Sequence, residues 1–196
     1  MTVFKHVDFE VPQWGEFTAG PQPWSAPAYT DAFDRPNESL ENSPSWAKRA
    51  GSASVSSNTL LGLSDALYAF NAPVDDDQYA QAEAINLFNS GFGAVRVQDG
   101  VGGYACRVLN SGTLVRLIRI ESNGTHTVRT SVGVAGGSVG DVYRLEAEGS
   151  TIRLKRNGVV LTSMTDTTYP TGKVGVAAGA TSASGIFADN WEGGNL

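Results

Sequence analysis

The sequence predicts an all-β protein, an antiparallel sandwich of two sheets that follows an extended N-terminal arm. Glycine is abundant, at 23 of 196 residues, and only 17% of the residues are charged. Short runs of β-branched and aromatic residues alternate with stretches rich in Ser, Thr and Gly. Many short strands of this kind are typical of a sandwich, and a chain of this length can bury a substantial core.

The composition changes near residue 30, so we expect an arm at residues 1–29 and a sandwich domain at residues 30–196. The arm holds four of the eight prolines and two of the four tryptophans, and proline favours extended backbone over helix. Its candidate partner-binding residues are Trp14, Phe17 and Trp24. These rings either fold back over the chain's own sandwich or dock on a neighbouring subunit, and the sequence leaves both readings open.

Beyond the arm, the clearest strands lie in the segment 141–161. Asn157-Gly158 is typical of a type I′ turn, because both central positions of that turn need a positive φ. The turn is expected to pair Leu154 with Leu161 on one face of the hairpin.

A second turn at residues 149–150 is expected to precede that hairpin. It pairs Glu146 with Arg153 on the solvent side and leaves Arg144 opposite Lys155. A turn one residue earlier would instead oppose Arg144 to Arg153, and like charges that face each other are unfavourable. The first register is therefore preferred.

Further short strands are predicted along the rest of the domain, at residues 53–55, 66–70, 93–97, 104–109, 114–120, 126–130, 174–178 and 185–191. The segment 75–88 is ambiguous. Its acidic start and alanine-rich body favour a helix, whereas strand alternation would place Ala80, Ala82 and Ala84 together on one side. The residues alone leave both possibilities open.

Charge and composition exclude several classes of function. The formal charge is -6, and no basic cluster is longer than two residues, so nucleic-acid binding is not expected. No apolar run approaches the roughly 20 residues that span a bilayer, and the N-terminus has no signal-peptide pattern. Cys106 is the only cysteine. We expect it to be a small buried hydrophobe in a protein that folds in a reducing cytosol.

Several motifs resemble the concanavalin A-like lectin/glucanase (laminin G-like) jelly roll over residues 30 to 196. They are Asp31-Ala-Phe33, Arg35-Pro36, Trp46, Gly51, Asn58, Asp77-Gln-Tyr-Ala-Gln-Ala-Glu83, Gly140-Asp141, Tyr143-Arg-Leu-Glu-Ala147, Gly149, Asn157-Gly158, Asp166, Tyr169, Gly172 and Gly175. The resemblance implies two packed antiparallel sheets and a strand at 75–88. It also implies that the first and last strands are adjacent, with Asp31–Phe33 beside Phe187–Asp189.

For a retaining glucanase, this resemblance implies a strand that carries the motif Glu-x-Asp-x-x-Glu, because two carboxylates must flank the scissile bond. The matching strand here reads Gln81-Ala-Glu83-Ala-Ile-Asn86, so that pair is absent and Glu83 is expected to face solvent. His6 and His126 are the only histidines, and neither has a convincing triad partner nearby in the sequence. We therefore expect no catalytic residues and no enzymatic activity.

Sugar binding on a sandwich usually needs an exposed aromatic ring. The candidate carbohydrate-binding residues are Tyr104, Tyr68 and Trp191, with core packing as the alternative for each, while Trp46 and Phe33 are expected in the core. No cofactor and no metal site are expected. Calcium is the alternative, with oxygen ligands from Asp75-Asp76-Asp77 or from Asp31, Asp34 and Asp189.

Modules that resemble this one occur in glycan-binding proteins, in glycosidases and in bacteriophage tail and capsid proteins. The missing signal peptide favours the phage context. We expect a non-enzymatic virion structural protein of minor capsid, decoration or tail type, made in the host cytoplasm, with a host-surface glycan as its candidate ligand. Its partners would be other virion proteins, reached through the arm, in a homo-oligomer or symmetric assembly. The alternative is a glycan-binding lectin or a glycoside hydrolase-like protein.

Overall fold

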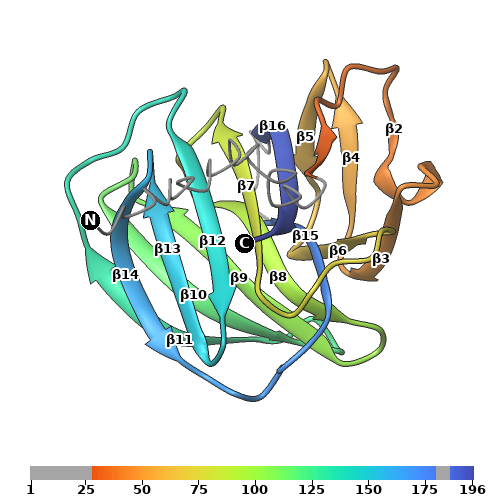
Figure 1. Cartoon of the computed structure of the whole chain (residues 1–196). Helices are drawn as coiled ribbons and strands as arrows, with labels where there is room; N and C mark the ends of the chain where they lie inside the picture. Colours follow the sequence, from red (N-terminus) through yellow and green to blue (C-terminus); the bar gives the residue numbers. More distant parts are fainter. Residues whose placement is uncertain (1–27, 180–185) are drawn as a thin grey trace, which may run out of the picture.

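The computed structural model describes residues 28–179 and 186–196. Within these residues the protein is a sandwich of two antiparallel sheets (Figure 1), which confirms the predicted fold class. No helix in the described part of the chain is long and apolar enough to cross a membrane. The rings of Trp14, Phe17 and Trp24 lie outside the described residues, so the arm and its boundary stay predictions.

One layer is a nine-stranded sheet, and β1 (Tyr29–Asp31) joins it by pairing with β16. In the order in which they neighbour one another, its other strands are β14 (Val159–Thr165), β13 (Thr151–Arg156), β12 (Val142–Glu148), β7 (Gln78–Ala84), β16 (Ile186–Asn195), β5 (Thr59–Gly62), β4 (Ala53–Ser56) and β2 (Glu38–Ser39). A short 3₁₀ turn, η1 (Leu40–Asn42), follows β2.

The other layer is a seven-stranded sheet, which lies behind the first in Figure 1. Its strands, again in spatial order, are β11 (His126–Gly133), β10 (Leu114–Glu121), β9 (Gly102–Leu109), β8 (Ser90–Gln98), β15 (Lys173–Ala178), β6 (Ala66–Phe70) and β3 (Trp46–Ala50).

The hairpin between β12 and β13 has the register that the sequence predicts. Glu146 stands opposite Arg153, and Arg144 stands opposite Lys155.

The next hairpin also has its expected turn, with φ of 49° at Asn157 and 81° at Gly158. Its expected pairing of Leu154 with Leu161 is wrong, however. A bulge after Leu154 shifts the register by one, so that Leu154 pairs with Thr162.

The ambiguous segment 75–88 contains a strand, β7, hydrogen-bonded to β12 on one edge and to β16 on the other. Ala80, Ala82 and Ala84 are buried between the sheets, while Gln81 and Glu83 face outward and are partly exposed. The helical preference of alanine is worth only a few tenths of a kcal/mol per residue. Two ladders of backbone hydrogen bonds and a buried alanine face outweigh it.

The two ends of the described chain meet in the nine-stranded sheet, as the family resemblance implies. The register differs from the expected one, because Asp31 stands opposite Trp191. Asp31 accepts a hydrogen bond from Nε1 of Trp46 over 2.7 Å and one from Nη1 of Arg35 over 2.6 Å. The rings of Trp46 and Trp191 meet edge to face at 4.8 Å. Trp46 and Phe33 are both buried, as expected.

The seven-stranded sheet curls so strongly that its two edges approach each other on its outer side. A Cβ built at Gly124, in the β10–β11 turn, would lie only 3.6 Å from Cβ of Ala50 on β3. Arg49 on β3 also forms an ion pair with Asp99 in the β8–β9 turn. The curl encloses a second apolar cluster outside the main core, made of Leu67, Ala69, Ala94, Val97, Ala105, Ile118, Ile120 and Ala177.

Candidate functional site

The aromatic rings that the sequence singled out for sugar binding lie in the core. The exposed fractions of Tyr104, Tyr68 and Trp191 are 0%, 1% and 0%. Nε1 of Trp191 donates to the carbonyl of Gly175 over 2.9 Å, and the hydroxyl oxygen of Tyr68 accepts from the N–H of Ala53. The expectation that they stack on a sugar is corrected, because large rings contribute most to stability when both of their faces are packed.

Three of the acidic residues weighed for calcium, Asp31, Asp75 and Asp77, accept hydrogen bonds from the protein itself. Oδ1 of Asp77 accepts from the N–H of Gly149 over 2.8 Å, and Oδ2 of Asp75 accepts from the side chain of Asn195 over 2.7 Å. Both carboxylate oxygens of Asp31 accept hydrogen bonds, one from Arg35 and the other from Trp46. Within the described ranges, no three His, Cys, Asp or Glu side chains are arranged to hold a metal ion.

Cys106 is fully buried, and burial raises the pKa of its thiol to about 12. The weak contact of its sulfur with the carbonyl of Gly93, at 3.9 Å, fits a packing role. His6 lies outside the described residues. His126, in contrast, faces a small pocket on the outer side of the seven-stranded sheet.

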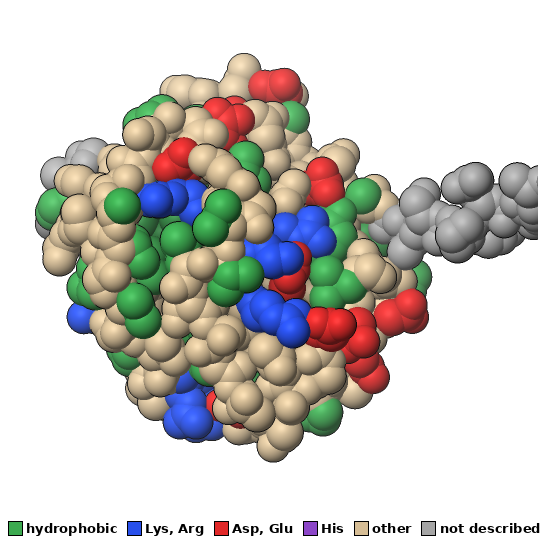
Figure 2. All heavy atoms as spheres, turned by 60° about the vertical axis from the view of Figure 1, so that its left-hand side comes forward, with side chains coloured by type: hydrophobic (Ala, Val, Ile, Leu, Met, Phe, Trp, Pro, Cys, Tyr) green, Lys and Arg blue, Asp and Glu red, His purple; other side chains and the backbone are tan. Residues whose placement is uncertain are grey.

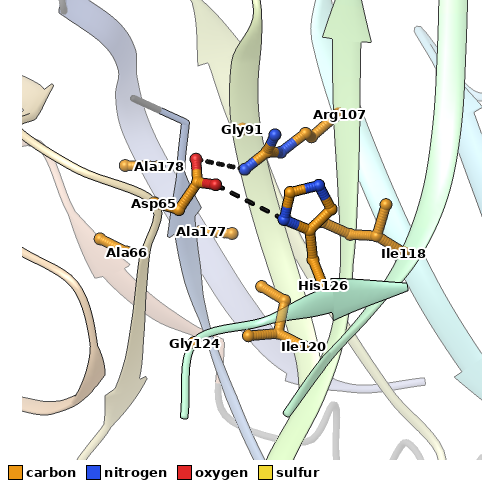
Figure 3. Close-up of a pocket in the computed structure, with 10 residues that line it drawn as sticks. All are labelled: Asp65, Ala66, Gly91, Arg107, Ile118, Ile120, Gly124, His126, Ala177 and Ala178. Atoms are coloured by element: carbon orange, nitrogen blue, oxygen red, sulfur yellow. Dashed lines mark ion pairs between the residues drawn. The ribbon is translucent and has the colours of Figure 1, made fainter. Parts of the chain in front are cut away.

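In that pocket, Asp65 lies between Arg107 and His126 (Figure 3). Its carboxylate pairs with Nη2 of Arg107 and lies 3.4 Å from Nδ1 of His126. The rest of the lining is small or aliphatic and consists of Ala66, Gly91, Ile118, Ile120, Gly124, Ala177 and Ala178. The cavity has a volume of about 10 Å³, which is room for one water molecule. The curled sheet is therefore too closed here to admit a sugar ring.

The outer side of the nine-stranded sheet carries a larger site, which we call the polar groove. It has a volume of about 430 Å³, and it is lined by Gln81 on β7, Val142, Arg144 and Glu146 on β12, Lys155 on β13, and the turn residues Asn157 and Gly158. These residues share one face because alternate residues of a strand point the same way. Figure 2 shows the molecule from the side of β13 and β14, where basic and acidic side chains lie next to one another.

Glu146 forms the polar floor of the groove and is only 4% exposed. Its Oε1 accepts hydrogen bonds from Nε of Arg144 over 2.7 Å and from Nζ of Lys155 over 2.8 Å. Burial alone would raise the pKa of Glu146, but these two hydrogen bonds outweigh it and hold the pKa below its ordinary value. Glu146 is therefore a fixed anion that orients two cations.

Tyr79 supports Arg144 from below. The guanidinium carbon of Arg144 lies 3.6 Å from the centre of the Tyr79 ring, a cation–π contact that limits the freedom of the arginine. The Tyr79 hydroxyl donates to Oε1 of Glu192 on β16. Burial, together with that carboxylate, raises the pKa of Tyr79 to about 12, so the hydroxyl keeps its proton.

Two carboxylates lie beside the groove on neighbouring strands. Glu83 on β7 stands directly opposite Asp189 on β16, and the amide of Asn190 donates to Oε2 of Glu83 over 2.9 Å. Burial raises the pKa of Asp189, and the charges of Asp34, Glu83 and Asp31 add to that rise, although the N–H of Asn190 opposes it. Asp189 thus holds its proton more readily than an ordinary aspartate does.

A third hollow, of about 440 Å³, lies between the β6–β7 loop and the start of β15 and is lined by Asn71, Ala72, Pro73, Val74, Gly172 and Lys173. It offers fewer side-chain hydrogen-bonding groups than the polar groove. The polar groove is the stronger candidate because five of its lining residues carry polar side chains.

The sequence predicts the arrangement of the groove residues on β12 and β13 but not the carboxylate pair beside them. The register of Arg144, Glu146 and Lys155 was predictable from one hairpin. The partner of Glu83 was not, because Asp189 lies 106 positions later and becomes a neighbour only when β16 is inserted between β5 and β7.

Solved structures match the sandwich at low identity. A carbohydrate-binding module, CBM66 of Bacillus subtilis, is 18% identical, with a TM-score of 0.54 over 77% of this chain and 92% of its own. A β-1,3-1,4-glucanase (lichenase) from a mouse hindgut metagenome is 12% identical, with a TM-score of 0.56 over 86% of this chain and 98% of its own. The β-glucanase of Bacillus licheniformis is 12% identical, with a TM-score of 0.51 over the same shares.

At these identities the likeness establishes the fold, and the chain is a concanavalin A-like jelly-roll sandwich. No protein-family model matches the sequence, and no curated protein does.

The expectation of a non-enzymatic protein is corrected by these matches. The solved structures that share the sandwich are mainly glycoside hydrolases, so this is a fold that carries catalysis. The exclusion rested on the lack of triad partners for the two histidines and on the absence of a carboxylate motif that lies within one strand. A carboxylate pair can instead come from two neighbouring strands, as Glu83 and Asp189 do here.

Proposed function

We propose that the chain is a glycan-binding sandwich that holds its ligand in the polar groove of the nine-stranded sheet. The observation that carries this proposal is the groove itself, about 430 Å³ in volume and lined by five polar side chains. Ligand sites of this size typically combine a few placed polar groups with some apolar surface. Val142 supplies apolar surface here.

The lining offers both kinds of hydrogen-bonding group that sugar hydroxyls need. Gln81 carries an amide that both donates and accepts, while Arg144 and Lys155 donate and the Glu146 carboxylate accepts. The known folds of a carbohydrate-binding module and of glucanases support a carbohydrate as the ligand class.

Isothermal titration with a panel of oligosaccharides tests the proposal. Gln81→Ala should weaken binding about tenfold, because it removes a lining amide without removing a charge. Thr127→Ala is the matched control, since Thr127 is exposed on β11 of the opposite sheet. Equal losses in both variants, or unchanged binding in Gln81→Ala, would place the ligand elsewhere.

Glycoside hydrolysis is a second candidate, favoured by the pairing of Glu83 with Asp189. A protonated Asp189 would donate to the leaving glycosidic oxygen as the C–O bond breaks, and Glu83 would accept the proton of the water that attacks the anomeric carbon. Release of reducing ends, lost in both Glu83→Gln and Asp189→Asn, would support this candidate. Release that survives both changes would remove it.

The virion setting remains a prediction from the sequence. It includes neighbours reached through Trp14, Phe17 and Trp24, assembly into a symmetric particle and synthesis in a host cytoplasm. Deleting residues 1–29 tests it: a variant that keeps its melting temperature but no longer joins a particle would support the prediction.

A further inference from the structure

The polar groove is a local basic site on an acidic chain. The whole chain carries a formal charge of -6, yet the groove lining contains two cations, Arg144 and Lys155, and one carboxylate, Glu146. Because Glu146 is almost fully buried, the groups left to meet a ligand are mainly the two cations. Their side chains keep exposed fractions of 27% and 26%.

The two cations converge on a single atom. Nε of Arg144 and Nζ of Lys155 both donate to Oε1 of Glu146, at 2.7 Å and 2.8 Å. They also stand directly opposite each other across β12 and β13, an arrangement of like charges that is unfavourable without an anion beside it. One carboxylate balances only one of the two charges, so the groove keeps a net positive charge.

Both cations retain donors for a ligand. A guanidinium has five N–H donors and an ammonium has three, and Glu146 takes one from each. Arg144 is also held against the Tyr79 ring at 3.6 Å, so part of the entropy cost of ordering a long side chain has been met before a ligand arrives. A guanidinium fork held in this way matches the two oxygens of a carboxylate.

Charge along the face gives such a ligand a direction. The cations Arg144 and Lys155 lie on β12 and β13 above the buried Glu146. The carboxylates of Glu83, Asp189 and Glu192 lie on β7 and β16. An anionic group would be attracted to the first side and repelled from the second. Neutral hydroxyls would then fall over Gln81, which stands between Arg144 on β12 and Glu192 on β16.

We propose that the groove selects an acidic glycan, one whose sugar rings carry carboxylates as uronic acids do, and that Arg144 and Lys155 bind the carboxylate. This inference rests on the proposed function, because it names the ligand class of the same groove.

The test compares one polymer in two forms, an oligogalacturonate and its carboxyl-reduced, neutral counterpart. The wild-type chain should bind the uronate form at least tenfold more tightly, and the preference should fall as salt rises, because exposed charges are screened. Lys155→Gln should reduce the preference at least fivefold. Glu146→Gln should increase it, since that change releases both cations from their internal anion.

Arg153→Gln is the matched control. Arg153 lies two residues from Lys155 on the same strand but pairs with Glu148 over 2.5 Å and does not line the groove. Its loss should leave the preference unchanged. A thermal melt of each variant confirms folding, and Lys155→Gln alone decides the matter if Glu146→Gln does not fold.

The outcomes separate this inference from the proposed function. Equal binding of the uronate and neutral forms overturns the acidic ligand and leaves the glycan groove standing. Equal losses in Lys155→Gln and Arg153→Gln also overturn it, because general attraction by surface charge would then explain the preference. Binding of neither form, nor of any other glycan, overturns both proposals.

Discussion

The hydroxyl of Tyr104 donates a hydrogen bond to Oδ1 of Asp166 over 2.8 Å and accepts one from the N–H of Tyr169 over 3.0 Å. These two hydrogen bonds connect the loop after β14 to β9 of the seven-stranded sheet. Oδ2 of Asp166 lies 3.0 Å from Nε of Arg129 on β11, which extends the network to the edge of that sheet. Tyr104, one of the three residues that the sequence offers for sugar stacking, is therefore a structural residue.

Tyr104→Phe should destabilise the fold by about 1–3 kcal/mol, because it removes one hydrogen bond from the buried Asp166 carboxylate and leaves the buried N–H of Tyr169 without its acceptor. Urea denaturation measures the change. Tyr29→Phe is the control, since the Tyr29 hydroxyl donates to the carbonyl of Pro73 in an exposed position, and it should cost under about 0.5 kcal/mol. Similar costs for both variants would contradict a buried network at Tyr104.

Asp166 should also shape stability in acid. Burial would raise the pKa of its carboxyl, but the hydrogen bonds from Thr168 and Tyr104 outweigh burial and lower it. A carboxyl with a lowered folded-state pKa contributes stability that is present above its unfolded-state pKa, about 3.9, and that is lost as the pH falls through the folded-state value.

Melting temperatures measured from pH 6 downward should therefore fall less steeply below about pH 4 in Asp166→Asn than in the wild type. The variant will be less stable at neutral pH, so the comparison is of slopes. If the melting temperatures of the two proteins fall with the same slope below about pH 4, Asp166 does not titrate with a lowered pKa.

The two sheets lie very close together where β8 passes β7. A Cβ built at Gly93 would lie 2.2 Å from the carbonyl oxygen of Ala80, which no side chain can tolerate. Gly93→Ala should therefore destabilise the fold by about 2 kcal/mol or more, as overpacked core positions do. Gly133→Ala is a suitable control, because its nearest neighbour would lie 4.0 Å away. Comparable stability of the two variants would contradict this close approach.

The pKa of Asp189 should lie above the ordinary value for aspartate, because burial and the neighbouring carboxylates both favour its protonated form. Carboxyl carbon chemical shifts followed by NMR give this pKa directly. Glu83→Gln should lower it by removing one of the negative charges that face Asp189. An unchanged Asp189 titration in that variant would show that the two carboxylates are not coupled.

The sequence alone was sufficient for much of the fold, because its strongest signals are local. Asn157-Gly158 indicates its turn through backbone geometry, and Glu146 opposite Arg153 follows from avoiding like charges in one hairpin. The bulge after Leu154 was not predictable, since it depends on how β14 fits against its neighbour. The strand at β7 was undecided until a family resemblance was considered, because alanine satisfies either structure.

The candidate site was harder to predict because it depends on which elements become neighbours. A retaining-glucanase motif lies in one strand and can be read directly, whereas Glu83 and Asp189 meet only through the insertion of β16. The sequence also does not show whether an aromatic ring is exposed or buried. Tyr104 follows two glycines, and that context is compatible with a ring on the surface or in the core. Only the packed sheets decide between them.

The most direct test of the central claim, that a glycan binds in the polar groove, is a titration followed by amide chemical shifts. With a bound oligosaccharide, the largest shifts should fall on Gln81, Lys155 and Gly158, which line the groove on β7, on β13 and in the β13–β14 turn. The amides around Asp65 and His126 on the opposite sheet should not move. Shifts confined to that opposite sheet, or no shifts with any glycan at millimolar concentration, would contradict the claim.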